Sequence, residues 1–183
     1  MKAAMQASVG EIGLAIELAG NQPGFEELVA LHQPKVLRTA YRLLGRLEDA
    51  QDACQEVFLR LLRNLRRIDG DPQAWLYRVT VNVCNDHFRR RTLSPEPVTD
   101  YADPAPDAER VLAMQERKRL LMDGLQTLPE RERAAVVLRD IEGLPTREVA
   151  RILSVEEVTV RTHICRARIA LAKYVRKRQQ EKP

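Results

Sequence analysis

The sequence is poor in the residues that build disulfide frameworks and metal sites. Its 183 residues include three cysteines and three histidines. Cys54, Cys84 and Cys165 are far apart, no Cys-x-x-Cys pair occurs, and an odd number of thiols argues against a disulfide framework. The histidines are isolated as well. We therefore expect no metal site and no cofactor.

Long hydrophobic runs are also missing. No stretch approaches the roughly 18 apolar residues that a membrane-spanning helix needs, and 31% of all residues are charged. Residues 1–22 superficially resemble an export signal, but Glu11 and Glu17 interrupt the apolar stretch. We expect a cytoplasmic protein without membrane insertion, in which residues 1–22 are an N-terminal extension.

Signatures of enzymes are equally absent. The sequence has no glycine-rich phosphate loop, no paired carboxylates and no nucleophile–base constellation. We therefore expect no catalytic residues and no small-molecule substrate.

Amphipathic helical patterns fill the first half of the chain. The first pattern covers residues 25–44 and includes Leu28 and Leu31 among its apolar positions. Pro34 is expected to break or kink this helix, because proline lacks the N–H and clashes with the preceding turn. Gly45 is expected to end it.

The clearest pattern covers residues 48–67. Its eight apolar side chains recur at helical spacing on one face: Ala50, Ala53, Cys54, Val57, Phe58, Leu61, Leu62 and Leu65. Acids precede bases on the polar face, an order that the helix dipole favours without any partner. A further helix is expected from about residue 72 to residue 91. Its inward side chains are expected to be Trp75, Leu76, Val79 and Val83.

Residues 92–107 differ abruptly in composition. These sixteen residues contain four prolines and four acids but no base. Such a segment cannot bury enough apolar surface to order itself, so we expect an acidic, flexible, proline-rich linker. The fold class expected is all-α, with small helical domains at residues 23–91 and 108–183 on either side of the linker.

The second domain begins with a helical pattern over residues 108–128. Pro129 starts another pattern, which Gly143 ends, and whose inward residues are Ala134, Val137, Leu138 and Ile141.

Residues 144–174 predict a short helix, a turn at residues 154–156 and a longer helix, with Thr146 as the N-cap of the first. One face of the longer helix is apolar at helical spacing: Val160, Ile164, Ala167, Leu171 and Tyr174. The other face carries Arg161, Thr162, Cys165, Arg166 and, on its flank, Arg168. This pattern is typical of a helix-turn-helix, whose second helix enters the DNA major groove. A helical hairpin with a solvated basic face is the alternative.

The C-terminal end is strongly basic, although the net charge of the chain is only +4. From Glu157 onward the sequence contains two acids, at positions 157 and 181, and eight bases: positions 161, 166, 168, 173, 176, 177, 178 and 182. This asymmetry indicates a polyanionic partner for that end of the chain.

Three stretches together resemble the extracytoplasmic-function, or group IV, sigma factors of bacterial RNA polymerase. They are DAQDACQEVFLRLLRN (49–64), AWLYRVTVNVCNDHFRRR (74–91) and LPERERAAVVLRDIEGLPTREVARIL (128–153) with VTVRTHICRAR (158–168). The resemblance covers roughly residues 25–174. It implies a first domain similar to sigma region 2, which binds the β′ clamp helices of core RNA polymerase and opens the minus-10 element. It implies a second domain similar to region 4, which binds the β flap and reads the minus-35 element.

The resemblance also implies roles for particular residues. Asp52, Gln55 and Glu56 would contact β′, whereas a solvated acidic first turn is the plain alternative. Promoter DNA at the minus-10 element would meet Arg78, Asn82, Asp86, Arg89, Arg90 and Arg91. The loop at residues 67–73, with Asn82 and Asp86, would hold an unstacked base. Trp75 invites a stacking role, although its place in the pattern favours the core.

In the helix-turn-helix, the minus-35 contacts implied by the resemblance are Arg161, Thr162, Cys165, Arg166 and Arg168. Arginine suits guanine or phosphate, and threonine can serve either. The turn departs from the family pattern of Gly, Ser and Gly, since Ser154, Glu156 and Val158 stand there. The linker would follow the path of nucleic acid in the polymerase or serve as a simple tether. The resemblance further implies an anti-sigma factor as a partner.

Two other functions fit parts of the sequence. A free-standing helix-turn-helix regulator would leave residues 25–91 unexplained, and a sigma-like adaptor would bind polymerase without initiating. The resemblance favours a sigma factor that directs promoter-specific transcription initiation.

Overall fold

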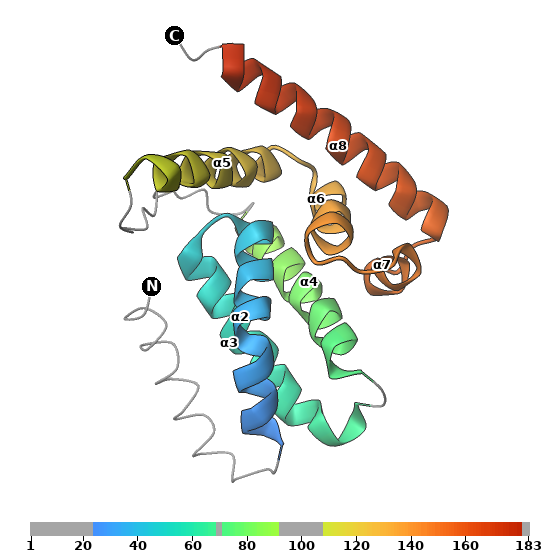
Figure 1. Ribbon diagram of the computed structural model, residues 1–183. Helices are drawn as coiled ribbons and strands as arrows, with labels where there is room; N and C mark the ends of the chain where they lie inside the picture. Colours follow the sequence, from blue (N-terminus) through green and yellow to red (C-terminus); the bar gives the residue numbers. More distant parts are fainter. Residues whose placement is uncertain (1–23, 69–70, 92–107, 181–183) are drawn as a thin grey trace. The chain divides into compact units, whose positions relative to one another are not determined.

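The computed structural model describes residues 24–68, 71–91 and 108–180, and of Arg91 and residues 108–115 it describes the backbone alone. The predicted N-terminal extension and acidic linker lie outside these residues. The chain divides into two compact units, residues 1–101 and 102–183 (Figure 1). Throughout the described ranges every regular element is helical, which confirms the predicted all-α class. None of these helices is long and apolar enough to cross a membrane.

Unit 1 is built from three helices that contact one another pairwise: α2 (Phe25–Leu44), α3 (Leu47–Asn64) and α4 (Pro72–Arg91). A short 3-10 turn, η1 (Leu65–Arg67), follows α3. The predicted stripe of α3 is confirmed, because six of its eight residues are buried, whereas Leu62 and Leu65 are half-buried. Cys54 and Cys84 are buried in this core, and burial raises the pKa of the Cys54 thiol to about 12.

Helix α2 runs unbroken through Pro34, so the predicted break is wrong. The side chains His32 and Val36, on either side of the proline, are buried in the core. The free energy gained by burying this side of the helix exceeds the cost of the one backbone hydrogen bond that proline removes. Leu31 was also misplaced, since it is 65% exposed. The buried series runs from Phe25 through residues 29, 32 and 36, and this phase puts Leu31 on another side of the helix. Gly45 ends α2 as predicted, with φ 80° and its N–H donating to the Tyr41 carbonyl at 2.8 Å.

The buried side of α4 is rotated from the predicted one. Leu76 and Val83 are buried as expected, but Trp75 and Val79 are only half-buried. Tyr77 and Thr80 enter the core in their place. The Thr80 hydroxyl can be buried because it donates to the Leu76 carbonyl at 2.7 Å, which satisfies its polar group inside the helix.

Unit 2 contains α5 (Ala108–Gln126), α6 (Glu130–Val136), η2 (Val137–Ile141), α7 (Thr146–Leu153) and α8 (Glu157–Gln180). The pattern predicted after Pro129 is thus α6 continued by the π-helical turn η2. Ala134, Val137 and Leu138 are buried as predicted, whereas Ile141 is half-buried.

A buried arginine closes the end of α5. The Arg133 guanidinium donates to the carbonyls of Leu128 at 2.9 Å and Gln126 at 3.3 Å, and to the Gln126 side chain at 2.8 Å. Backbone carbonyls at a helix C-terminus lack intrahelical partners, and a cation there is favourable. Arg133 therefore fixes the corner between α5 and α6.

Helices α7 and α8 form the predicted helix-turn-helix. Ser154, at the turn, takes the left-handed conformation (φ 55°, ψ 46°) and its N–H donates to the Ala150 carbonyl. The predicted N-cap at Thr146 is wrong by one residue, because Pro145 occupies the cap and its carbonyl accepts from the N–H groups of Glu148 and Val149. The fixed φ of proline suits this cap position, and no side-chain cap hydrogen bond forms there.

The apolar stripe of α8 holds it against the rest of unit 2. Val160, Ile164 and Ala167 are buried, whereas Leu171 and Tyr174 are half-buried. Leu171 and Tyr174 lie against α5 at Gly124, where an added Cβ would come within 3.0 Å of the Leu171 side chain. The stripe thus turns the opposite face of α8 outward.

Candidate functional site

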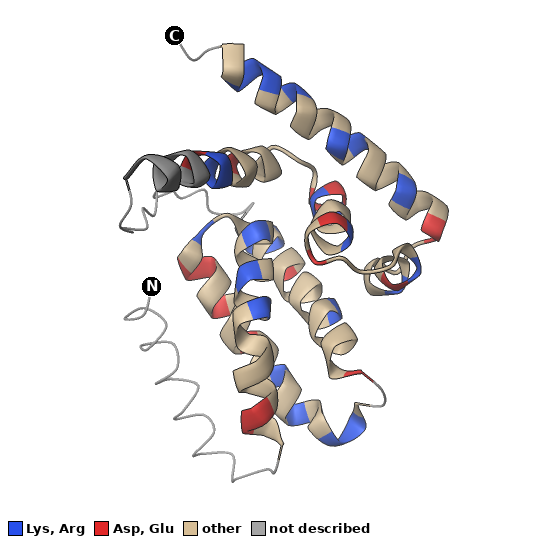
Figure 2. Ribbon diagram, viewed as in Figure 1, with Lys and Arg blue, Asp and Glu red and all other residues tan. Residues whose placement is uncertain are grey.

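Helix α8 is strongly basic, with seven arginines and lysines and one acid between Glu157 and Gln180. Figure 2 shows basic residues recurring along this helix, with the acidic Glu157 at its N-terminal end. The side chains of Arg161, Thr162, Cys165, Arg166 and Arg168 are all exposed. The structure therefore leaves all five predicted minus-35 residues exposed, with Arg168 on the flank of α8 nearest to η2.

Two of these residues already have partners within α8. Arg161 forms an ion pair with Glu157 at 3.1 Å, and both side chains are well exposed. The Thr162 hydroxyl donates to the Val158 carbonyl at 3.0 Å. Because that proton is used within the helix, Thr162 offers a ligand its methyl group and its hydroxyl lone pair rather than a free donor.

Arg168 differs from the others because it is held from outside α8. Its guanidinium donates to both carboxylate oxygens of Asp140 in η2, at 2.7 and 2.8 Å, and this bond raises the pKa of Arg168. A bidentate arginine–carboxylate pair fixes direction as well as distance. Arg168 thus ties α8 to η2, a contact that the sequence did not reveal because the residues are 28 positions apart.

The exposed face of α4 gathers the predicted minus-10 residues. Arg78, Asn82, Arg89 and Arg90 are exposed, Asp86 is half-buried, and the Arg91 side chain lies outside the described residues. The spacing of positions 75, 78, 82 and 89 places them on one side of the helix. The half-buried Trp75 therefore borders this face, although the sequence favoured a core position.

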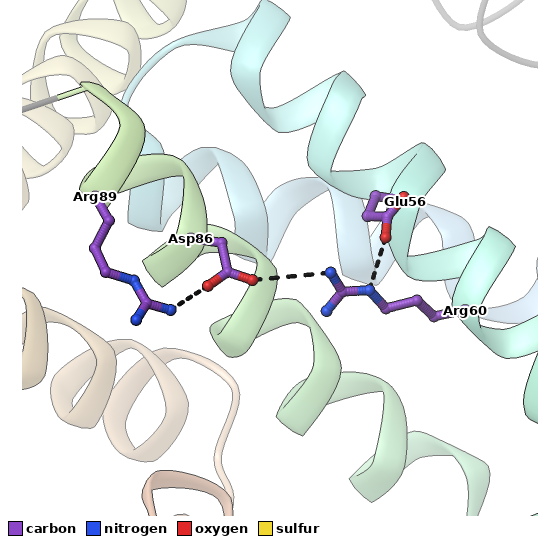
Figure 3. Close-up of polar contacts among 4 residues, drawn as sticks. All are labelled: Glu56, Arg60, Asp86 and Arg89. Atoms are coloured by element: carbon purple, nitrogen blue, oxygen red, sulfur yellow. Dashed lines mark hydrogen bonds and ion pairs between the residues drawn. The ribbon is translucent and has the colours of Figure 1, made fainter. Parts of the chain in front are cut away.

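An ion-pair network joins α3 to α4 (Figure 3). Arg60 donates through Nε to Glu56 at 2.7 Å and lies 3.8 Å from the Asp86 carboxylate, which also pairs with Arg89. Glu56 and Asp86 were predicted to face different partners, polymerase and DNA. Sequence reasoning missed that Arg60 connects them, although the i,i+4 spacing from Glu56 is a recognisable signal.

The predicted polymerase-binding residues share the outward side of α3. Asp52 is exposed, whereas Gln55 and Glu56 are half-buried. Asp52 directly precedes the buried residues Ala53 and Cys54, and Gln55 and Glu56 directly follow them, so the core packing of α3 sets their direction. Among the described residues no group of three or more histidine, cysteine or acidic side chains is placed to hold a metal ion.

Comparison with known proteins matches two separate parts of the chain. Residues 28–93 match the family model of sigma-70 region 2, and residues 118–171 match that of sigma-70 region 4. The sequence is 36% identical over 167 residues to the ECF RNA polymerase sigma factor SigM of Mycobacterium tuberculosis, covering 87% of this chain and 81% of SigM. It is 38% identical over 165 residues to SigE of Mycolicibacterium smegmatis, covering 87% of this chain but only 64% of that protein.

A solved structure shares the architecture. CnrH, in complex with the cytosolic domain of CnrY, superposes with a TM-score of 0.63 at 28% sequence identity, covering 90% of this chain and 96% of CnrH. The similarity to SigM extends through both helical units and is too high for a shared fold alone. The chain therefore belongs to the extracytoplasmic-function sigma factors of the sigma-70 family.

Proposed function

We propose that the protein is a dissociable, non-catalytic subunit of RNA polymerase that directs transcription initiation at particular promoters. The observation that carries this proposal is the pairing, in one chain, of a region 2-like unit with an exposed basic face on α4 and a region 4-like unit with a basic recognition helix. A free-standing helix-turn-helix regulator has no use for the first unit.

Residues 23–91 would act as the region 2-like domain and residues 108–183 as the region 4-like domain, with residues 92–107 as the linker. The two family matches support this division. The exposed arginines of α4 would contact phosphates at the minus-10 element, which gives salt-dependent affinity without sequence information. The exposed face of α8 would read the minus-35 element in the major groove.

Asp52, Gln55 and Glu56 are proposed to bind the β′ clamp helices, and the β flap is the proposed partner of the second unit. Packing of the opposite face of α3 supports this assignment, because it leaves these polar groups on the solvent side of a firmly held helix. An anti-sigma factor is a further proposed partner, and it would act by covering these surfaces.

Run-off transcription with core polymerase and a promoter library tests the function. Defined start sites should appear only when core enzyme and this protein are both present. A shift of DNA by the protein alone, with no transcript under any condition, would identify a repressor instead. Polymerase binding without transcripts would identify an adaptor.

The polymerase contact has its own test. Asp52→Ala should weaken binding to core polymerase at least tenfold while leaving the circular-dichroism melting curve unchanged, because Asp52 is exposed. Glu27→Ala removes the same charge from an exposed position on α2 and is the matched control. Equal binding by both variants and the wild type would refute the assignment.

A further inference from the structure

Helix α8 carries a second apolar stripe, on the side opposite its buried one. Val158 is 64% exposed and Ile169 is 52% exposed. With Thr162 and Cys165 they follow the spacing i, i+4, i+7 and i+11, which puts all four on one line along the helix. Isolated exposed apolar residues need no explanation. This line, however, runs along the middle of the face proposed to meet DNA.

Val158 is the residue of that line nearest to the N-terminus of α8. It is the second residue of α8, and the first turns of the second helix are the part of a helix-turn-helix that contacts base edges. Arg161 and Arg166 flank the line on its two sides. Arginines in such positions contact the phosphates on the two sides of the groove. An apolar side chain midway between them then lies over the bases rather than over the backbone.

Thr162 adds a second methyl group one turn further along. Its hydroxyl proton is held by the Val158 carbonyl at 3.0 Å, so the methyl group is what it offers without breaking that bond. Residues four apart on a helix are neighbours, so Val158 and Thr162 present adjacent methyl groups. The one apolar group in the DNA major groove is the C5-methyl group of thymine.

We propose that Val158, together with the Thr162 methyl group, contacts the 5-methyl group of a thymine in the minus-35 element and so determines specificity at that base pair. This inference rests on the proposed function, because it requires α8 to lie in promoter DNA. Ile169 does not share the role. It lies eleven residues beyond Val158, about 16 Å along the helix axis and thus well past the N-terminal turns that contact base edges.

Deoxyuridine substitution tests the contact, since uracil differs from thymine only in lacking the 5-methyl group. Holoenzyme is assembled from core polymerase and the full chain, and a promoter that it transcribes is chosen. Each thymine of the minus-35 element, on either strand, is then replaced singly by deoxyuridine. Wild-type holoenzyme should lose about fourfold in promoter affinity at one or two positions, the amount expected from burying one methyl group.

The variants decide which side chain is responsible. Val158→Ala holoenzyme should bind the thymine promoter more weakly and lose much less than the wild type on deoxyuridine substitution. Thr162→Ser, which keeps the hydroxyl, should show a reduced effect at the same position. Ile169→Ala, an apolar truncation at another exposed position of α8, should behave like the wild type, and melting curves check that all the variants fold.

Three results would overturn the inference. They are an unchanged affinity on every deoxyuridine substitution, a deoxyuridine effect that persists in Val158→Ala, or a uniform gain in affinity by Val158→Ala on all sequences, which would place Val158 against the backbone. Absence of any promoter-dependent transcript from wild-type holoenzyme is a separate outcome, and it would overturn the proposed function and this inference together.

Discussion

At the scale of single residues, His32 is a buried imidazole in the core of unit 1. It lies on the inward side of α2 and is only 6% exposed. Burial lowers the pKa of His32, and the neighbouring Lys35 lowers it further, whereas Asp71 partly opposes the shift. The folded protein therefore resists protonation of this ring more than the unfolded chain does.

This difference predicts a pH-dependent stability. In the unfolded chain histidine takes up a proton near pH 6.5, and in the folded state His32 does so only at lower pH. Stability from this residue is thus present above about pH 6.5 and is lost as pH falls below it. Urea unfolding between pH 7.5 and 5 should show a decreasing free energy of unfolding, with a smaller slope in His32→Gln. Identical slopes in both proteins would contradict the prediction.

Glu157 is the one acid within α8, and it pairs with Arg161 across one turn. An exposed pair of this kind stabilises a helix by only about 0.3–0.5 kcal/mol. Its carboxylate would lie close to DNA phosphates. Glu157→Gln should therefore strengthen promoter-DNA binding several-fold at low salt, because it removes a repulsion and releases Arg161.

Fluorescence anisotropy with a minus-35 duplex over a range of salt concentrations measures this effect, which should shrink as salt screens the charges. Glu130→Gln removes the same charge from an exposed site in the first turn of α6 and should have a smaller effect. A loss of affinity in Glu157→Gln would mean that the carboxylate itself accepts a bond from the DNA bases.

At the scale of elements, the turn between α7 and α8 contains a strained residue. Ser154 has φ 55°, the only positive φ of a non-glycine residue in the described ranges. The left-handed region costs an L-residue roughly 1–2 kcal/mol, whereas glycine enters it freely. Ser154→Gly should therefore raise the free energy of unfolding of unit 2 by up to about 1 kcal/mol after its greater unfolded-state entropy is counted.

Chemical denaturation followed by circular dichroism tests the turn. Ser154→Ala is the control, since it removes the hydroxyl but keeps the Cβ, and it should bring no gain. A loss of stability in Ser154→Gly would show that the serine hydroxyl contributes more than the backbone strain costs.

The elements themselves were largely predictable from the sequence, because periodic apolar spacing and glycine at helix ends are local signals. The stripe of α3, the stripe of α8 and the ends at Gly45 and Gly143 are examples. Pairings between distant residues were not predictable. Arg133 at the end of α5 and Asp140 beside Arg168 look like ordinary surface charges until the helices are packed together.

The prediction of the buried side of α4 failed for a different reason. Its sequence offers valine, threonine and aromatic residues on nearly every side, so periodicity alone does not select a face. A threonine is a core residue only when its hydroxyl finds a carbonyl, as Thr80 does. With that selection, Trp75 shares with Asn82 the side of α4 that is proposed to face the promoter.

At the scale of the whole molecule, the two surfaces proposed to read the promoter belong to units with their own cores. Buried residues of unit 1 come from α2, α3 and α4, and those of unit 2 from α5 to α8. Each recognition face is the reverse side of a helix that its own core holds. A substitution that destabilises one core should therefore remove the promoter contacts of that unit and leave those of the other unit intact.

Leu61→Ala tests this separation. Leu61 is fully buried on α3, so its truncation should destabilise unit 1 by about 2–5 kcal/mol. Hydrogen exchange should accelerate across α2, α3 and α4, while the amides of α7 and α8 keep their wild-type protection. Leu62→Ala, the same truncation at a half-buried neighbouring position, should cost less. Equal loss of protection in both units would show that they unfold as one, and promoter binding would then depend on a single cooperative structure.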